Sequence, residues 1–382
     1  MVLVRLEGAP DAPARRPPRT GTLLRGTRVA VPDSIVISID AMGGDHGPSV
    51  VAPAIAHALG VLAGRDVRFL LHGDEQRLNA ELAKLPAVRA VSQVRPSSLV
   101  IGMEDKPAHA LRRGKGSSLW NAVQAVGAGQ AHAALSAGNT GALMAISKHI
   151  LRMVSAELDR PAIVASWPTV RGITAVLDVG ANISSDAAQL VEFAIMGEAF
   201  HRAVHGVDKP TVGLLNVGSE EQKGHEEVRE AHRLLRDGGL QIDYRGFVEG
   251  DDIAKGTVDV VVTDGFSGNI ALKTAEGLAR FVRAMLRETF SSDLRARLGA
   301  LIAGPALRRM AARLEPPNGG PLLGLKGIVV KSHGGADAKA FADAIMVAVN
   351  LAGSDYSSVI DGNMRRFADV TGRIGAPAER AS

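Results

Sequence analysis

The 382-residue chain contains no cysteine. This absence excludes disulfide bonds, thiolate metal sites and a cysteine nucleophile. Aromatic residues make up only 3% of the chain, so Ala, Val, Leu and Ile must form the core. No apolar run reaches the ~18 residues that a membrane-spanning helix needs, and the N-terminus lacks the apolar segment of a secretory signal.

A strong charge of one sign is also missing. The formal net charge is +4, and residues 1–34 alone hold six arginines and three acids, so the remaining chain carries about +1. A nucleic-acid-binding protein would carry a larger positive charge, so we expect no nucleic acid partner. Residues 1–33 are rich in Arg and Pro and lack periodicity, which predicts a disordered extension. A targeting arm and an over-extended start are the alternatives.

Glycine is abundant, with 43 residues, and much of it separates apolar runs. Continuously apolar segments alternate with amphipathic ones along the chain. This pattern predicts an α/β protein with three layers (α/β/α), in which helices cover both faces of a largely parallel sheet. Strands are expected over 34–40, 67–73, 88–94, 132–138, 161–167, 172–180, 210–218 and 258–265, and helices over 49–64, 75–84, 117–131 and 139–154.

Residues 291–314 stand apart, with five arginines, one acid and many Leu and Ala. Gly304-Pro305 is predicted to break this segment into a helical hairpin. Its apolar side would pack on the body or on a partner subunit; alternatively, a basic amphipathic hairpin would contact a membrane surface. The catalytic domain is expected to cover 34–364 and to be followed by a tail over 365–382.

The loops that follow the apolar strands share a composition of Gly with Asp, Asn, Ser or Lys. Ligands of open parallel sheets bind beyond the carboxyl ends of the strands, where these loops lie. Glycine lets backbone N–H groups approach a ligand, and helix N-termini and lysines add positive potential, so the loops favour phosphate. They cover residues 41–48, 136–142, 179–185, 217–224, 265–273 and 328–337.

Standard motifs are missing from these loops. The sequence has no Walker-type phosphate loop, no G-x-G-x-x-G after a strand and no G-x-S-x-G around Ser267. His225 and His232 are seven residues apart and do not form H-E-x-x-H. The residues alone therefore predict an α/β enzyme with a phosphate-binding cleft, without a nucleotide, nicotinamide or zinc site.

Most polar residues of the loops have a structural and a functional interpretation. An acid at a strand end caps the next turn or serves the site, and a turn histidine is structural, carries a proton or binds a metal. A helix-start residue caps the helix or binds the anion, and a lysine is a surface residue or a counter-charge. These residues are Asp40, Asp178, His46, Ser267, Asn139, Thr140, Lys106, Lys115, Lys223 and Lys331.

Seven segments match one family pattern in order. They are IDAMGGDHGP (39–48), EDKPAHALRRGKGSSL (104–119), SAGNTGALMA (136–145), LDVGAN (177–182), TDGFSGNIALKT (263–274), PLLGLKGIVVKSHGGADAKAF (321–341) and IDGNM (360–364). Together they resemble the PlsX family of phosphate acyltransferases over residues 34–364. One departure is Asn318, which stands where the family carries a tyrosine, so no aromatic contact is expected there.

The resemblance implies a fold similar to isocitrate and isopropylmalate dehydrogenases and to phosphotransacetylases. It implies a homodimer, without metal or cofactor, that transfers a long-chain acyl group from acyl-[acyl carrier protein] to inorganic phosphate. The acyl phosphate would supply a membrane glycerol-3-phosphate acyltransferase in phospholipid synthesis, and the protein would be cytoplasmic with peripheral membrane contact. The alternatives are a phosphotransacetylase using acyl-coenzyme A, an isocitrate-type dehydrogenase and a lipid-binding scaffold.

Because no cysteine can carry the acyl group, we expect a phosphate oxygen to attack the thioester carbonyl directly. Fixed donors must then stabilise both the phosphate and the oxyanion. His46 would stabilise the oxyanion or protonate the departing thiolate, and an acidic carrier protein would dock on arginines. The predicted catalytic residues are His46, Asp45, Asn139 and Lys273; the phosphate-binding residues are Gly138, Asn139, Thr140, Lys106 and Lys115; the supporting residues are Asp40, Asp178, Asp264, Ser267 and Asn269; and the docking residues are Arg112, Arg113, Arg308 and Arg309.

Overall fold

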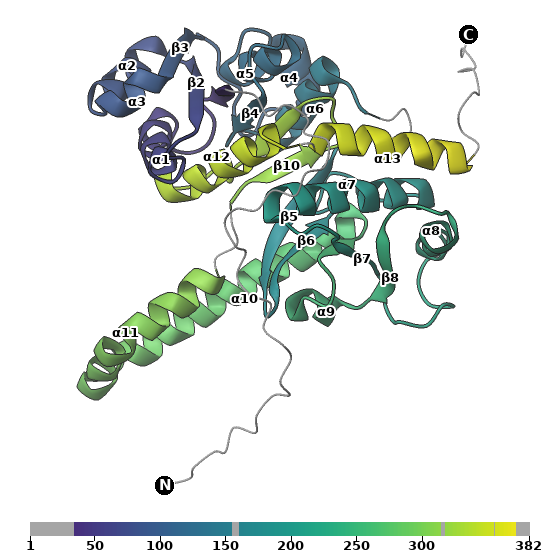
Figure 1. Ribbon diagram of the computed structural model, residues 1–382. Coiled ribbons are helices and arrows are strands. Elements are labelled where there is room, and N and C mark those ends of the chain that lie inside the picture. Colours follow the sequence, from purple (N-terminus) through teal and green to yellow (C-terminus); the bar gives the residue numbers. More distant parts are fainter. Residues whose placement is uncertain (1–33, 155–159, 315–317, 355, 372–382) are drawn as a thin grey trace.

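The structure is a computed structural model that describes residues 34–154, 160–314, 318–354 and 356–371 (Figure 1). The predicted extension at 1–33 lies outside these residues, as does the end of the predicted tail. The first part of that tail is instead helical, because α13 (Tyr356–Thr371) continues past residue 364.

Eleven strands form one sheet in the described part of the chain. They are β1 (Ser34–Asp40), β2 (Asp66–Gly73), β3 (Ser92–Pro96), β4 (Ala133–Ser136), β5 (Ala162–Thr169), β6 (Gly172–Leu177), β7 (Thr211–Leu215), β8 (Asp243–Val248), β9 (Val260–Val262), β10 (Gly320–Leu323) and β11 (Ile328–Lys331). Their order is β3-β2-β1-β4-β11-β10-β5-β6-β9-β7-β8. Pairing is antiparallel only at the centre, between β11, β10, β5 and β6. The predicted largely parallel sheet is confirmed.

The short strand β10 and its neighbour β5 lie between two half-sheets whose strands run in opposite directions. The first half-sheet is β3-β2-β1-β4-β11 and the second is β6-β9-β7-β8. The first residue of β10, Gly320, pairs with Lys331 at the end of β11, whereas its last two residues pair with the start of β5. Across β5, Val164 pairs with Leu177, the last residue of β6. The carboxyl ends of the two half-sheets therefore meet on either side of β10 and do not lie at opposite edges of the molecule.

Helices cover both faces of the sheet (Figure 1). In β4, Ala133 and Leu135 belong to the main core with α12, whereas Ala134 faces a second core with α5 and α6. Alternate residues of a strand point to opposite faces, so both faces are buried. The helices are α1 (Pro48–Val61), α2 (Glu75–Ala83), α3 (Pro86–Val91), α4 (Pro107–Arg113), α5 (Ser118–Gly127), α6 (Thr140–Leu151), α7 (Ala187–His205), α8 (Glu226–Asp237), α9 (Gly250–Lys255), α10 (Gly265–Ser291), α11 (Leu294–Leu314), α12 (Ala338–Ala352) and α13.

Two predicted elements are wrong in part. The segment 88–94 is not one strand, because Pro86 takes the first position of the short helix α3 and β3 begins only after it. Gly304-Pro305 does not break α11. Pro305 is exposed, so water can bond the carbonyl that the missing N–H leaves open. The hairpin turns instead before α11, where the carboxylate of Asp293 accepts the N–H of Ala296 at 2.8 Å.

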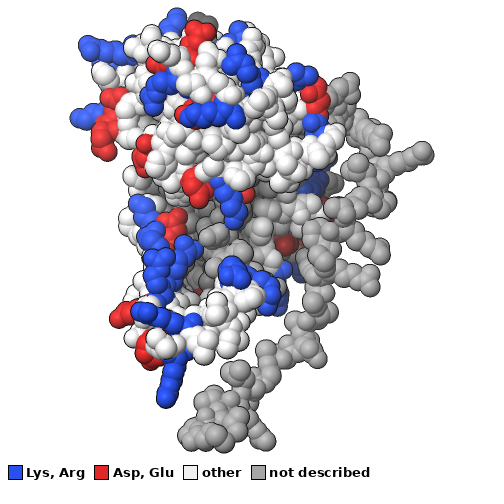
Figure 2. All heavy atoms as spheres, turned by 90° about the vertical axis from the view of Figure 1, so that its left-hand side faces the viewer, with Lys and Arg blue, Asp and Glu red and all other residues white. Residues whose placement is uncertain are grey.

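The hairpin therefore spans residues 265–314 and consists of α10 and α11, which pack on each other and project from the body (Figure 1). It holds nine Lys and Arg and three Asp and Glu. Figure 2 shows the side of the molecule from which the hairpin projects, and Lys and Arg side chains gather on the lower part of this face. The hairpin's large apolar side chains at Phe281, Leu294, Leu298 and Leu301 are exposed, so they do not pack on the body. None of the described helices has the length and apolar character to cross a membrane.

Candidate active site

Two glycine-rich loops of the first half-sheet are joined through Asp40 at the end of β1. Its buried carboxylate accepts the hydroxyl of Ser136 at 2.7 Å, and that hydroxyl oxygen accepts the N–H of Gly138 at 2.9 Å. Burial raises the pKa of Asp40. A Cβ at Gly43 would lie 2.5 Å from the Asp40 carboxylate, so only glycine allows this approach. Asp40 thus fixes the loop that leads into α6.

Asn139 holds the start of α6 against the loop 102–105. Its Nδ2 donates to three carbonyls of that loop at 2.7, 2.8 and 3.2 Å. Its Oδ1 accepts the N–H of Ala142 at 3.0 Å and caps the helix. These bonds occupy the amide of Asn139, whereas the next residue, Thr140, lines the cleft described below.

Asp178 fixes the corresponding loop of the second half-sheet. Its carboxylate accepts the N–H groups of Ile163 at 2.9 Å and Ala181 at 3.0 Å, and the side-chain amide of Asn182 at 3.0 Å. Burial raises its pKa, although these bonds act in the opposite direction. A Cβ at Gly268 would lie 1.9 Å from the Asp178 carbonyl oxygen, so α10 can begin here only with glycine at that position.

Asp264 starts α10 and directs its first turns toward the centre of the sheet. Its carboxylate accepts the N–H and the hydroxyl of Ser267, both at 2.9 Å. Ser267 is therefore a cap partner. Asn269 and Lys273, which follow one and two turns later, line the cleft described next.

A cleft of about 630 Å³ lies beside β10, where the carboxyl ends of the half-sheets meet. The loops after β4, β11, β6 and β9 all contribute to it, which brings together four of the six glycine-rich loops. Thr140, Asn269, Lys273 and Lys331 supply its main polar groups, and Glu276 is the one acid among its described lining residues. The arrangement of two cations and a helix N-terminus suits a phosphate.

Lys331 is a site residue that the sequence analysis considered as a surface lysine or a counter-charge but did not include among the phosphate-binding residues. It ends β11, and its ammonium group donates to the Ala137 carbonyl at 3.4 Å and also to the Ser332 carbonyl. Burial lowers its pKa to about 8, while attraction by Asp40 and Asp45 acts in the opposite direction. Its position directly after the apolar run IVV was the available signal, since strand ends border the site.

Asn318, where the resemblance implied a tyrosine, is buried beside this cleft. Its amide donates to the Ser332 hydroxyl at 2.8 Å and to the Ala340 carbonyl at 2.9 Å, and its Oδ1 accepts the N–H of His333 at 3.2 Å. An amide thus fixes the loop that follows Lys331.

Of the eight predicted catalytic and phosphate-binding residues, only Thr140 and Lys273 line the cleft; Gly138 and Asn139 support its wall, and four others lie farther from it. Asp45 and His46 are exposed, although the N–H of Asp45 donates to the Gly334 carbonyl at 2.9 Å and joins their loop to the loop after β11. Lys106 and Lys115 are exposed on either side of α4. None of the four lines the cleft, so the geometry gives them no direct contact with a ligand there.

The predicted docking arginines form two separate groups. Arg112 and Arg113 end α4, on the body of the molecule, whereas Arg308 and Arg309 lie on α11 of the projecting hairpin (Figure 1). All four are exposed. Because the two pairs lie on different parts of the molecule, their positions do not indicate a single docking surface for one partner protein.

Solved structures of similar fold include phosphotransacetylases. One from Streptococcus pyogenes superposes with a TM-score of 0.57 at 16% identity, covering 84% of this chain and 94% of that chain. The EutD phosphotransacetylase from Staphylococcus aureus gives a TM-score of 0.55 with the same identity and coverage. At this identity the likeness concerns the fold alone, and it confirms the predicted fold class.

The sequence itself matches a family described as "Fatty acid synthesis protein" over residues 35–359. The phosphate acyltransferase of Caulobacter vibrioides is 67% identical over 343 residues, which cover 89% of this chain and 94% of the relative. That of Phenylobacterium zucineum is 61% identical over 350 residues, which cover 91% and 99%. These matches confirm the resemblance found in the seven segments: the chain belongs to the PlsX family of phosphate acyltransferases and transfers an acyl group to phosphate.

Proposed function

We propose that the acyl donor is long-chain acyl-[acyl carrier protein] and that phosphate attacks its thioester in the cleft beside β10. The observation that carries this proposal is the convergence of Lys273, Lys331 and the N-terminus of α6 on one cavity. A phosphate dianion needs such counter-charges, and an oxyanion that forms beside it needs fixed donors. Acyl phosphate made in this way is a substrate for glycerol-3-phosphate acylation by a membrane enzyme.

The reaction needs no covalent enzyme intermediate. A phosphate oxygen adds to the thioester carbonyl, the C–S bond breaks, and the proton given up by hydrogen phosphate passes to the departing thiolate. The backbone N–H groups of Thr140 and Gly141 open α6, where N–H groups lack helical partners, so we assign them as backbone donors to the phosphate. Lys273 and Lys331 neutralise its charge. Asn139 acts by holding the first turn of α6 in place.

His46 and the two surface lysines receive no role in this scheme. The His46 side chain is exposed outside the cleft, so it stays a sequence prediction that the geometry does not support. The same holds for Lys106 and Lys115. Asp40, Asp178 and Asp264 act through the loops that they fix, because a carboxylate in direct contact with phosphate would repel it.

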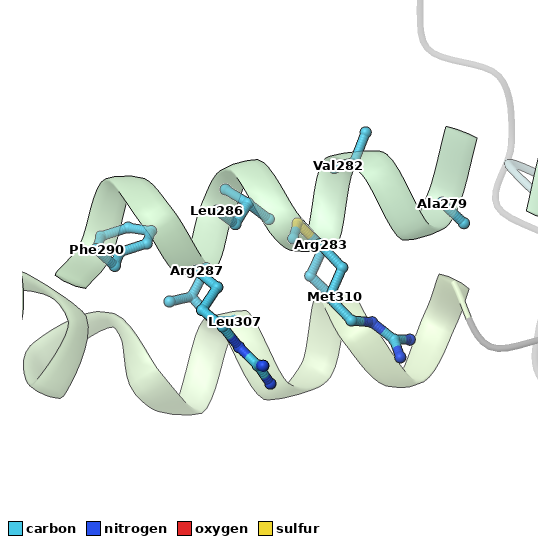
Figure 3. A pocket seen from close by; sticks show the side chains of 8 residues that line it. All are labelled: Ala279, Val282, Arg283, Leu286, Arg287, Phe290, Leu307 and Met310. Carbon is cyan, nitrogen blue, oxygen red and sulfur yellow. The ribbon is translucent and has the colours of Figure 1, made fainter. Parts of the chain in front are cut away.

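We also propose that the end of the hairpin contacts an anionic membrane surface. A small apolar groove of about 240 Å³ separates its helices, and Figure 3 shows Leu286, Phe290 and Leu307 within it. Arg283 and Arg287 extend from α10 toward α11 in the same view. Exposed leucines together with arginines are typical of interfacial helices. Arg308 and Arg309 are then membrane-facing, and Arg112 and Arg113 remain for the carrier protein.

The remaining apolar surface of α10 suits a second copy of the chain. Phe281 and Met285 are 59% and 50% exposed, which is unusual for two large apolar side chains one turn apart on a helix. We propose that they belong to a homodimer interface nearer the body than the membrane-contacting end. Sedimentation equilibrium of the Phe281→Asp variant tests this; a dimer as tight as that of the unaltered chain contradicts it.

The experiment that tests the proposed activity measures free thiol released from long-chain acyl-[acyl carrier protein] and from acyl-coenzyme A, with and without orthophosphate. We expect release that requires phosphate and is faster with the carrier protein. Phosphate-dependent release that favours acyl-coenzyme A would show that the donor is wrong. Thiol release at the same rate with and without orthophosphate would show that the acyl group passes to another acceptor.

A further inference from the structure

A second cavity of about 1030 Å³ runs along α6 on the side of α4. Six residues of α6 line it; three of them, Thr140, Met144 and Lys148, follow at intervals of four, and Arg152 continues this line directly after the helix. Residues four apart lie on one face of a helix, so they form one wall. We call this cavity the α6 groove. Along this wall, the hydroxyl of Thr140 is followed by the apolar side chain of Met144 and then by the cations of Lys148 and Arg152.

The α6 groove opens into the cleft at Thr140, which lines both cavities. The two cavities also adjoin at the centre of the sheet, because Gly180 lines the groove and its neighbour Val179 lines the cleft. Likewise, Pro161 lines the groove and Ile163 lines the cleft. A ligand lying in the groove therefore reaches a phosphate in the cleft at the start of α6.

Positive charge gathers at the other end of the groove. Arg152, Arg160 and Lys326 line it together with Lys148, and no Asp or Glu is among its described lining residues. The N–H of Lys326 donates to the Arg152 carbonyl at 3.1 Å, so the two basic residues are neighbours. Arg152 has φ 65° and ψ 167°, a conformation that residues other than glycine rarely adopt. Such strain is kept mainly where it serves a site.

The length of the groove matches a particular ligand. From Thr140 to Arg152 the chain rises ~18 Å, at about 1.5 Å for each residue of a helix. A phosphopantetheine arm has about thirteen bonds between its sulfur and phosphorus, and an extended chain covers ~3.5 Å in about three bonds, so the arm spans ~15 Å. The arm has a mostly uncharged middle and one anionic end, in the same order as the wall of the groove.

We propose that the α6 groove holds the phosphopantetheine arm of the acyl carrier protein, with its phosphodiester at Arg152 and Lys326 and its thioester at Thr140. This inference rests on the proposed carrier-protein donor. Leu111 of α4 also lines the groove, and Arg112 and Arg113 follow it at the end of that helix. The predicted carrier-docking arginines on the body thus border the cavity that would receive the carrier's arm.

The test compares three donors in the variant Arg152→Gly/Lys326→Ala. They are long-chain acyl-[acyl carrier protein], acyl-phosphopantetheine and acyl-pantetheine, which lacks the phosphate. Glycine at position 152 removes the cation and tolerates the positive φ. Arg89→Ala/Lys209→Ala is the matched control, because it removes the same charge from exposed residues that line neither cavity.

We expect KM to rise at least about tenfold for the two phosphorylated donors, since charge-assisted hydrogen bonds are lost. KM for acyl-pantetheine and for orthophosphate should stay unchanged, which also shows that the variant is folded. An equal change for all three donors, or no change for any of them, overturns the groove assignment. If the unaltered protein uses acyl-coenzyme A and not the carrier protein, the proposed donor fails separately, whatever the variant does.

Discussion

Replacing Lys331 by Met tests whether this partly buried lysine binds the phosphate. A hydrogen bond to a charged group contributes about 1.5–3 kcal/mol, and each 1.4 kcal/mol is a tenfold change, so KM for phosphate should rise about 10- to 100-fold. KM for the acyl donor should change much less, because the α6 groove lies on the other side of Thr140. The control is Lys209→Met, which removes an exposed lysine that lines neither cavity.

The same substitution affects stability through Asp40. Asp40 is buried and its charge attracts Lys331, but the burial of the lysine outweighs this attraction, because the pKa of Lys331 is lowered. Below pH 8 we therefore expect the single variant to unfold at a higher temperature than the unaltered chain, and the double variant Asp40→Asn/Lys331→Met, which also removes the buried carboxylate, to gain further stability. The double variant should not recover phosphate affinity. Calorimetry and phosphate titration of thiol release separate the two effects.

Lys331 also predicts opposite pH trends for binding and stability. Its pKa is about 8 in the folded protein, below the ordinary value of 10.5. Between these values the unfolded chain binds more protons than the folded chain, so the contribution of Lys331 to stability improves as the pH rises across this window. Phosphate affinity should instead fall as the pH passes 8, because the cation is lost. A folded Lys331→Met variant with unchanged KM for phosphate and an unchanged pH profile would refute this assignment.

Three further predictions concern the supports of the site and the hairpin. Gly268→Ala places a Cβ 1.9 Å from the Asp178 carbonyl oxygen and should destabilise the protein by about 1–3 kcal/mol. In the control Gly277→Ala, the new Cβ lies in the same helix and meets nothing within 4 Å, so this change should be neutral or stabilising. Equal melting temperatures of the two variants would contradict the tight packing at Gly268. Asn139→Ala should cost about 1–2 kcal/mol, lower the rate and speed amide hydrogen exchange around Asp105; unchanged exchange there would mean that other contacts hold the loop. Leu298→Asp should reduce cosedimentation with anionic vesicles more than Val61→Asp, an equally drastic change at an exposed position of α1; equal retention would remove the hairpin from membrane binding.

Much of the fold was predictable because its strands are apolar runs bounded by glycine. Segments such as SIVISID and VDVVVTDG can be buried on both faces, and only a covered, mainly parallel sheet accommodates them. The reversal of direction at β10 was not predictable, since its four residues resemble any short apolar segment. The unbroken α11 escaped prediction for another reason: a proline break depends on whether the carbonyl one turn earlier faces water, which periodicity does not reveal.

The candidate site was predictable as a set of loops but not as a set of roles. Glycine next to Asp or Asn indicated the turns correctly, because close backbone packing at Gly43 and Gly268 demands it. Whether a polar side chain faces the ligand or its own loop depends on side-chain direction. Asn139 turns toward neighbouring carbonyls, and Lys331 extends beside the cleft. Both residues stand near the end of an apolar strand and beside a glycine-rich loop, so sequence alone could not show which of them faces the cleft.

The length of α10 has a mechanical consequence. The helix starts at its cap, Asp264, places Lys273 in the cleft about two turns later, and then runs on for a total of 27 residues, which is ~40 Å. If it pivots at its cap, a tilt of about 5° moves its far end by ~3.5 Å but moves Lys273 by only ~1 Å, in proportion to the rise along the axis. The end of the projecting hairpin can therefore adjust its position against a surface by a few ångströms, while Lys273, near the pivot, moves by only ~1 Å. A movement of the far end of α10 thus displaces the residues that line the cleft only slightly.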